Sequence, residues 1–203
     1  MLLVGLSKGL FFCLQVELIL NSIVFIEKDI SRALTRISHE ILEKNKGANN
    51  LAIVGIRTRG VTLAERVRKK INEIEGIEIN FGVLDITLYR DDLASGKQNP
   101  IIEKTNISFP LDGKQVVLID DVLFTGRTIR AAIDALIDFG RPASVQLGVL
   151  IDRGHRELPI RPDYVGKNIP TSKTNRVQVL MREDDGMDEV RVIDSSTPDN
   201  RDV

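Results

Sequence analysis

The stretch Val116–Thr128, VVLIDDVLFTGRT, carries most of the information about the fold. It begins with four aliphatic residues, continues with two adjacent carboxylates, and ends in a Thr-Gly-Arg-Thr turn that opens a helical pattern. A buried strand, a polar turn and a helix N-terminus are predicted in that order. This order is typical of α/β proteins, in which ligands bind at the carboxyl ends of the strands.

The turn at the end of this stretch has the chemistry of a phosphate site. The first N–H groups of a helix have no partner within the helix and lie at the positive end of its dipole, which favours an anion. Gly126 allows the backbone to approach the anion, and Thr125 and Thr128 add hydroxyl groups, with Thr128 expected as the N-cap. Asp120 and Asp121 can accept hydrogen bonds from sugar hydroxyls or face a magnesium-bound substrate. The alternative is an acidic turn that only caps a helix.

Strands and helices alternate on both sides of this stretch. Apolar residues at helical spacing predict helices over Glu27–Asn45, from Leu63 to a stop at Gly76, and over Thr128–Phe139. Short apolar or alternating runs predict strands at Leu51–Ile56, Ile77–Tyr89, Gln115–Ile119, Val145–Ile151, Arg176–Met181 and Glu189–Ile193. The alternation predicts a mostly parallel sheet that is flanked by helices on both faces.

Two polar regions interrupt this pattern, and a basic turn follows one strand. Arg90–Pro110 is long enough that we expect a functional or mobile loop, and Asp152–Asn175 is expected to be irregular because it holds three prolines. The turn Arg57–Gly60, Arg-Thr-Arg-Gly, follows the strand Leu51–Ile56, at the same edge of the sheet as the acidic turn. A basic turn is ordinarily solvated surface, but next to a phosphate site we interpret it as a second anion site.

Composition excludes several classes of protein. The 203 residues suffice for one domain, and the formal net charge of -1 means that any contact with nucleic acid needs a local basic patch. With Cys13 as the single cysteine, neither an intrachain disulfide nor a cysteine zinc site can form, which favours a reducing, cytoplasmic setting. Neither the Walker pattern G-x-x-x-x-G-K-[ST] nor the dinucleotide pattern G-x-G-x-x-G occurs.

The apolar N-terminus stands apart from the rest. Met1–Ile26 is rich in aliphatic residues, but polar residues such as Lys8 and Glu17 interrupt it, so that no run reaches the length of a membrane span. A signal peptide, a membrane anchor, a partner-binding helix and a start site placed too far upstream are the alternatives. We expect residues 1–23 to be an extension foreign to the fold and residues 24–203 to form a single domain.

The motif order of strand, two acids, three residues and Thr-Gly-x-Thr resembles the signature that binds phosphoribosyl pyrophosphate (PRPP) in type I phosphoribosyltransferases. Other segments resemble one family of that class, the bifunctional pyrimidine operon attenuators and uracil phosphoribosyltransferases. The resemblance runs from about Val24 to about Ile193, and the first two dozen residues have no counterpart in it. The segments that carry it are Arg32–Ile37, Asp85–Leu93, Gly140–Pro142, Asp152–Arg161 and Val165–Ser172.

This resemblance implies the type I phosphoribosyltransferase fold, α/β with a mostly parallel sheet flanked by helices and a mobile hood loop. It implies conversion of uracil and PRPP to UMP and pyrophosphate with Mg²⁺ that accompanies PRPP and faces Asp120 and Asp121. The expected catalytic residues are Asp120, Asp121 and Arg90. Expected substrate contacts are Thr58, Arg59, Arg90, Asp120, Asp121, Val122, Leu123, Phe124, Thr125, Gly126, Arg127, Thr128, Arg153 and Val177, with Thr58 and Arg59 at the pyrophosphate.

One position bears on the choice of base. Related purine enzymes tend to carry an acid just before the Thr-Gly of the motif, where it can bond the purine ring. Phe124 stands at this position here, which favours a pyrimidine because the purine-specific partner is missing. The alternative is that Phe124 simply packs.

The resemblance also implies a regulatory partner. Proteins of this family bind the leader mRNA of pyrimidine genes when uridine nucleotides such as UMP or UTP are plentiful, and promote transcription termination. The positions expected to contact RNA are Thr35, Arg36, His39, His155, Arg156 and Lys167. A homodimer or larger assembly without membrane contact is expected. Two alternatives stay open: an RNA-binding attenuator with little transferase activity, and a phosphoribosyltransferase for another base without an RNA role.

Overall fold

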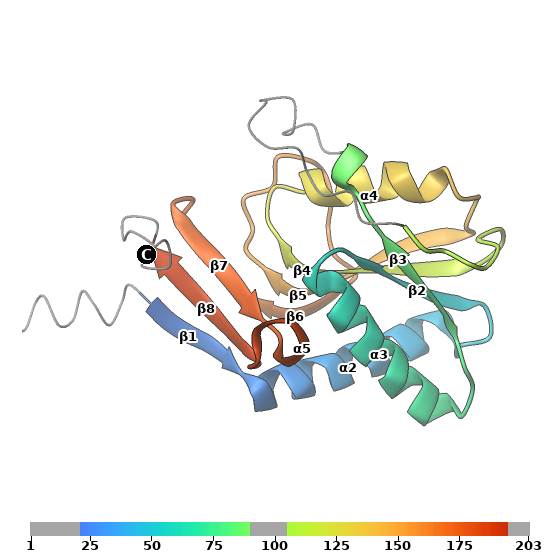
Figure 1. The fold of residues 1–203 in the computed structure, drawn as a ribbon, viewed down its shortest axis with the longest axis horizontal. Helices are drawn as coiled ribbons and strands as arrows, with labels where there is room; N and C mark the ends of the chain where they lie inside the picture. Colours follow the sequence, from blue (N-terminus) through green and yellow to red (C-terminus); the bar gives the residue numbers. More distant parts are fainter. Residues whose placement is uncertain (1–20, 90–104, 195–203) are drawn as a thin grey trace, which may run out of the picture.

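Two β-sheets lie side by side in the computed structural model, which describes residues 21–89 and 105–194 (Figure 1). The larger sheet is parallel, in the order β3-β2-β4-β5-β6, and the smaller is antiparallel, in the order β1-β8-β7. The parallel strands are β2 (Leu51–Ile56), β3 (Asn80–Leu84), β4 (Gln115–Leu123), β5 (Ser144–Asp152) and β6 (Tyr164–Asn168). The antiparallel strands are β1 (Asn21–Ile26), β7 (Asn175–Leu180) and β8 (Glu189–Asp194).

Helices cover both faces of the parallel sheet. In Figure 1, α2 (Glu27–Asn45) and α3 (Arg59–Glu75) lie below it and α4 (Arg127–Ile137) lies above it. The strand residues alternate between the two resulting cores: Leu51 and Ile53 pack with α2 and α3, whereas Ala52 and Val54 pack with α4. Two short elements complete the described fold, the 3-10 helix η1 (Thr87–Tyr89) and the helix α5 (Arg182–Asp185).

The order of the strands creates a switch point between β2 and β4. From β2 the chain crosses through α3 to β3 on one side, and from β4 it crosses through α4 to β5 on the other. The loops after β2 and β4 therefore leave the sheet next to each other, on opposite faces. Ligands of open parallel sheets bind in the crevice at such a point.

The predicted α/β architecture is confirmed, with corrections at element boundaries. Helix α2 and strand β2 have the predicted bounds, and α3 ends at Gly76, in the left-handed conformation. However, β4 continues through Leu123, because its pairing with β5 extends past the acids, so both aspartates lie on a strand. Helix α4 begins at Arg127 with Gly126 as its N-cap, so Thr128 is not the cap.

Two strands were not expected. The stretch predicted to be irregular contains β6, which pairs with β5 at the edge of the large sheet. Strand β1 begins at Asn21 and pairs with β8, so residues 21–23 belong to the small sheet rather than to a foreign extension. Residues 1–20 lie outside the described residues, and so does most of the long loop that was expected over Arg90–Pro110. Within the described ranges, no helix is long and apolar enough to cross a membrane.

Candidate functional site

The basic turn and the acidic strand end meet at the switch point. Thr58 is the N-cap of α3 and Arg59 its first residue; the Arg57–Thr58 peptide bond is cis. A Cβ atom on Gly60 would stand 2.6 Å from the carbonyl oxygen of Ile119 and 3.2 Å from Cα of Asp120. The start of α3 therefore packs directly on the backbone of β4, which only glycine permits.

The two carboxylates at this junction are differently placed. Asp120 is 6% exposed, and its Oδ1 accepts the Asp121 N–H at 2.9 Å. Asp121 is partly exposed, and its Oδ1 accepts the Val122 N–H at 2.8 Å. Burial raises the pKa of Asp121, although the hydrogen bond from the Val122 N–H, the side chain of Asp120 and the positive charge of Arg59 oppose the shift. A cationic or hydroxyl-bearing ligand would add partners that favour the charged form.

The two carboxylates fit a magnesium ion that arrives with its substrate. No group of three or more His, Cys, Asp or Glu side chains within residues 21–89 and 105–194 could hold a metal on its own. Mg²⁺ keeps several waters and commonly binds through one or two carboxylates plus substrate phosphates. Asp120 and Asp121 supply that limited set of oxygens, and not a complete cage.

The turn after β4 has the geometry of an anion cradle. Gly126 has a φ of 95°, and α4 opens directly after it, so the first N–H groups of the helix point out of the turn. The loop beyond β5 supports the turn, since the carbonyl of Thr125 accepts the N–H of Glu157 at 3.0 Å and that of Leu158 at 3.2 Å. Arg127 Nε donates to Glu157 at 2.8 Å.

Arg153 and Phe124 form a stacked pair beside this turn. The Arg153 guanidinium lies 4.1 Å from the centroid of the Phe124 ring. Arg153 is 8% exposed, its Nε donates to Thr171 Oγ1 at 3.1 Å, and its Nη2 donates to the carbonyls of Ser172 and Asn175. Burial lowers the pKa of Arg153. Phe124 thus packs against protein on at least one face, and its part in base selection stays a prediction.

Arg156 points into the molecule. Its Nη1 donates to the carbonyl of Phe124 at 2.8 Å and to that of Gly154 at 3.0 Å, while Nη2 donates to Asp152 at 2.6 Å. Its Nε donates to the carbonyl of Ile160 at 2.9 Å. Arg156 therefore braces the turn that carries Phe124. The expectation from sequence covered only an RNA contact and missed this role, for which the local sequence holds no signal.

The other expected RNA contacts fall into two places. Arg36 Nη2 donates to the carbonyls of Val165 and Gly166, both at 2.8 Å, which joins α2 to β6 beside Lys167. Thr35 and His39 lie on the same helix, and His39 is exposed. His155 lies instead beyond the carboxyl end of β5, where its Nε2 is 2.5 Å from the carbonyl oxygen of Thr171 and its ring contacts Phe124 edge-on.

Three expected substrate residues have side chains that pack inward. Leu123 is 1% exposed and lies in the core beneath α4. Val122 and Val177 pack against the core that includes the buried faces of α2 and α3. These positions can contact a ligand mainly through the backbone or a side-chain edge. Arg90 lies outside the described residues.

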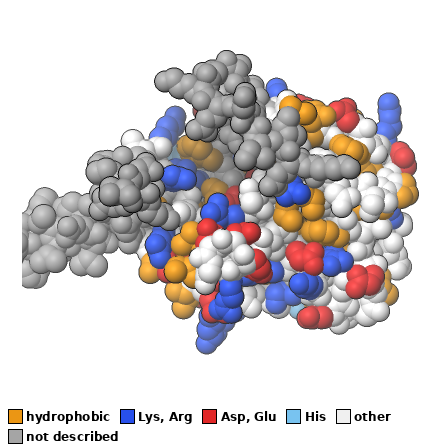
Figure 2. Space-filling model, in the orientation of Figure 1, with side chains coloured by type: hydrophobic (Ala, Val, Ile, Leu, Met, Phe, Trp, Pro, Cys, Tyr) orange, Lys and Arg blue, Asp and Glu red, His pale blue; other side chains and the backbone are white. Residues whose placement is uncertain are grey.

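A cluster of charges missing from the sequence expectations joins α3 to α5. Figure 2 shows acidic and basic side chains gathered around α5. Arg59 Nη2 donates to Asp185 Oδ1 at 2.9 Å, and Arg59 Nε donates to Asp185 Oδ2 at 3.2 Å. This hydrogen bonding to Asp185 is the main reason that the pKa of Arg59 is raised.

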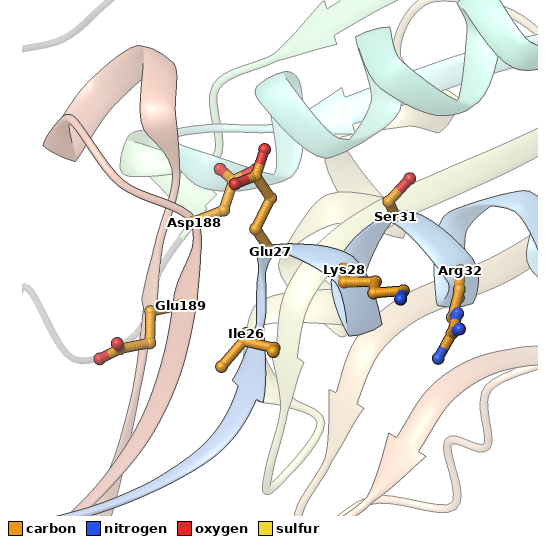
Figure 3. A pocket seen from close by; sticks show the side chains of 7 residues that line it. All are labelled: Ile26, Glu27, Lys28, Ser31, Arg32, Asp188 and Glu189. Atoms are coloured by element: carbon orange, nitrogen blue, oxygen red, sulfur yellow. The ribbon is translucent and has the colours of Figure 1, made fainter.

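A hollow in the surface lies apart from these loops. It is formed where β1, the start of α2 and the start of β8 meet (Figure 3). Its lining residues are Ile26, Glu27, Lys28, Ser31, Arg32, Asp188 and Glu189. None of them is an expected site residue, so the hollow does not contribute to the site at the switch point.

Comparisons with known proteins show which family and which fold this chain is similar to. A model of the phosphoribosyl transferase domain matches residues 22–184. The chain is 61% identical over 166 residues to the bifunctional protein PyrR of Deinococcus radiodurans, covering 82% of this chain and 91% of that protein. It is 58% identical over 177 residues to that of Listeria monocytogenes, covering 86% and 97%. Hypoxanthine phosphoribosyltransferase of Trypanosoma cruzi, a K68R mutant, has a TM-score of 0.67 at 19% identity, covering 86% and 95%, and shows the fold alone.

Proposed function

The chain belongs to the family of bifunctional PyrR proteins and has the type I phosphoribosyltransferase fold, and we propose that it transfers the phosphoribosyl group of PRPP to uracil. The observation that carries this proposal is the approach of Gly60 to Ile119 and Asp120. It places the basic turn after β2 against the carboxylates of β4, next to the anion cradle. The site can then bind the pyrophosphate, the ribose and the 5′-phosphate of one PRPP molecule at the same time.

The reaction is a displacement at the anomeric carbon. A bond forms between N1 of uracil and C1′ of the ribose, the bond from C1′ to the pyrophosphate oxygen breaks, and N1 loses its proton. Positive charge develops on the ribose in the transition state, and nearby carboxylates can stabilise it. The protein contributes mainly by binding the two substrates and orienting them for the displacement. Magnesium that accompanies PRPP would neutralise charge on the leaving pyrophosphate.

Each group of residues has a defined part in holding the substrate. Thr58 and Arg59 bind the pyrophosphate, because the start of α3 offers free N–H groups and a cation. Residues 125–128 bind the 5′-phosphate through the first N–H groups of α4. Asp120 and Asp121 would accept hydrogen bonds from the ribose hydroxyls and would help to hold the magnesium ion that accompanies PRPP. They also favour the developing positive charge on the ribose.

The base end of the site lies near Phe124. Arg153 stacks on the Phe124 ring and donates hydrogen bonds to the carbonyls of Ser172 and Asn175. This arrangement gives a flat, partly apolar wall and offers no carboxylate to a purine ring at position 124. We therefore expect uracil to be preferred, with Val177 near the base and Arg90 closing over the substrate.

The test is release of pyrophosphate from PRPP and Mg²⁺ with uracil, and separately with hypoxanthine, guanine and orotate. Turnover with uracil alone supports the proposal. The Asp120→Asn/Asp121→Asn double variant should lose most of this turnover, by a factor on the order of 10³. Turnover with another base, or near-normal turnover in the double variant, contradicts the assignment.

We also propose that the chain binds pyrimidine leader mRNA in a uridine-nucleotide-dependent way. The α2–β6 junction carries the cations Arg36 and Lys167 together with His39, in a chain with a formal net charge of -1, although Arg36 Nη1 also pairs with Glu40 at 2.7 Å. His155, another expected RNA contact, lies apart from this junction and contacts Phe124, which connects the base end of the transferase site with the RNA contacts. A gel shift with leader RNA, with and without UMP, separates this function from that of a transferase without an RNA role.

The remaining proposals concern the setting. We expect a homodimer or larger assembly, which light scattering of the purified chain tests directly. A cytoplasmic location follows from the proposed mRNA partner. A folded chain that binds UMP and RNA but turns over no base would favour the alternative of a regulator with idle transferase chemistry.

A further inference from the structure

Helix α5 and Asp188, which follows it, contact the first half of α3 through several charged side chains. Arg66 donates to Asp188 with two hydrogen bonds of 2.7 Å and to Glu183 at 2.9 Å, and Thr62 Oγ1 donates to Asp184 at 2.8 Å. Gly186, in the left-handed conformation, ends the helix. These contacts place α5 without the help of Arg59.

The last residue of α5 makes a different contact. Both carboxylate oxygens of Asp185 accept hydrogen bonds from Arg59, as described above, and Oδ2 also accepts the N–H of Met181 at 2.9 Å. A two-point contact between a carboxylate and a guanidinium fixes the orientation of the arginine as well as its position. The Nη1 donors of Arg59 take no part in it, so they stay available to an anion.

The start of α3 lies against the end of β4 that carries the two carboxylates. A Cβ atom on Gly60, the neighbour of Arg59, would stand 3.4 Å from Asp120 Oδ1, and Asp121 is the next residue along the strand. The charge of Asp121 also raises the pKa of Arg59. Without Asp185, the long Arg59 side chain would regain rotamer freedom and could pair with Asp121 across the site. Such a pair would occupy both the cation meant for pyrophosphate and the carboxylate meant for ribose or magnesium.

We propose that Asp185 is a positioning residue for PRPP binding: it holds Arg59 toward the pyrophosphate and away from Asp121. This inference rests on the proposed function. Asp185 acts through Arg59 and not on the base. Its loss should therefore weaken the binding of PRPP, while the affinity for uracil should stay unchanged.

The test is steady-state kinetics of uracil phosphoribosylation in Asp185→Asn, which keeps the shape of the side chain but removes its charge. We expect the KM for PRPP to rise by about tenfold, the KM for uracil to stay within about twofold, and kcat to fall less than the PRPP affinity does. Asp185→Glu should recover part of the loss. The matched control is Glu183→Gln, in the same short helix, which should leave the KM for PRPP unchanged.

Arg59→Gln and the double variant complete the design. If Asp185 acts through Arg59, the two substitutions are non-additive, and the double variant resembles Arg59→Gln alone. A KM for PRPP that rises in Arg59→Gln but not in Asp185→Asn overturns the inference and leaves the proposed function standing. An unchanged KM for PRPP in Arg59→Gln overturns the assignment of Arg59 instead. Equal effects of Asp185→Asn and Glu183→Gln indicate a structural role of α5 and also overturn the inference.

Discussion

Asp121 has both a proposed binding role and an environment that disfavours its charge. Burial raises its pKa, so the folded protein favours the neutral carboxyl. A raised carboxyl pKa contributes stability at low pH, and that contribution is lost as the pH rises through the pKa of the folded state. At neutral pH the charged Asp121 is therefore expected to weaken the fold.

We predict that Asp121→Asn raises the melting temperature at pH 7 while it lowers transferase activity. The gain should shrink as the pH falls through the raised pKa of Asp121, since the wild-type carboxyl then becomes neutral as well. Thermal unfolding followed by circular dichroism at several pH values measures both. The control is Asp112→Asn. Asp112 is an exposed carboxylate that precedes the start of β4, whereas Asp121 lies near the other end of this strand. A gain that does not depend on pH would contradict the electrostatic explanation.

The position of α3 against β4 sets the geometry of the site at the scale of elements. The two elements approach so closely at Gly60 that no side chain fits between them. The helix carries Thr58 and Arg59, and the strand carries Asp120 and Asp121. A shift of a few tenths of an ångström in α3 would therefore change the distance between these two pairs of side chains, which are proposed to bind different parts of the substrate.

We predict that Gly60→Ala destabilises the protein by about 1–3 kcal/mol, because the new methyl group would overlap the backbone of β4. The expected loss of transferase activity exceeds what the unfolded fraction explains, since the pyrophosphate turn is displaced. Denaturant unfolding and kinetics on the same samples separate the two effects. Glu73→Ala, on the exposed side of α3, should change neither quantity. Full activity in a stable Gly60→Ala variant would show that the close approach is not required.

At the scale of the whole molecule, the proposed transferase site and most of the proposed RNA contacts lie on different surfaces. The proposed transferase site is at the switch point, whereas Arg36, His39 and Lys167 lie along α2 and β6. Arg156 belongs to both descriptions, because it braces the turn that carries Phe124. A substitution at Arg156 therefore cannot separate the two functions cleanly.

We predict that His39→Ala and Lys167→Ala weaken the binding of leader RNA and leave uracil turnover unchanged. For Lys167→Ala, the slope of log affinity against log salt should fall by about 1 if the lysine contacts a phosphate. Fluorescence anisotropy at several salt concentrations measures this slope. Lys69→Ala, an exposed lysine on α3, serves as the matched control. An unaltered affinity in both variants would place the RNA surface elsewhere.

The sequence alone determined the α/β class, helix α2 and strand β2, and it predicted the chemistry of both turns. These features depend on hydrophobic periodicity and on turn residues, which act over a few neighbouring positions. The expected groups at the site, from Asp120 to Thr128, follow from the same local order. Family resemblance added the substrate and the RNA, which no local pattern specifies.

Only the tertiary structure decided the features that depend on distant partners. Strand β6 is short and ends in Lys167 and Asn168, so its sequence carries little strand signal, and it exists because β5 offers an open edge. Arg59 and Asp185 are 126 positions apart. The inward course of Arg156 likewise depends on acceptors such as Phe124 O, 32 positions away. Contacts of this range depend on how the packed elements place the backbone, and no periodicity in the chain encodes them.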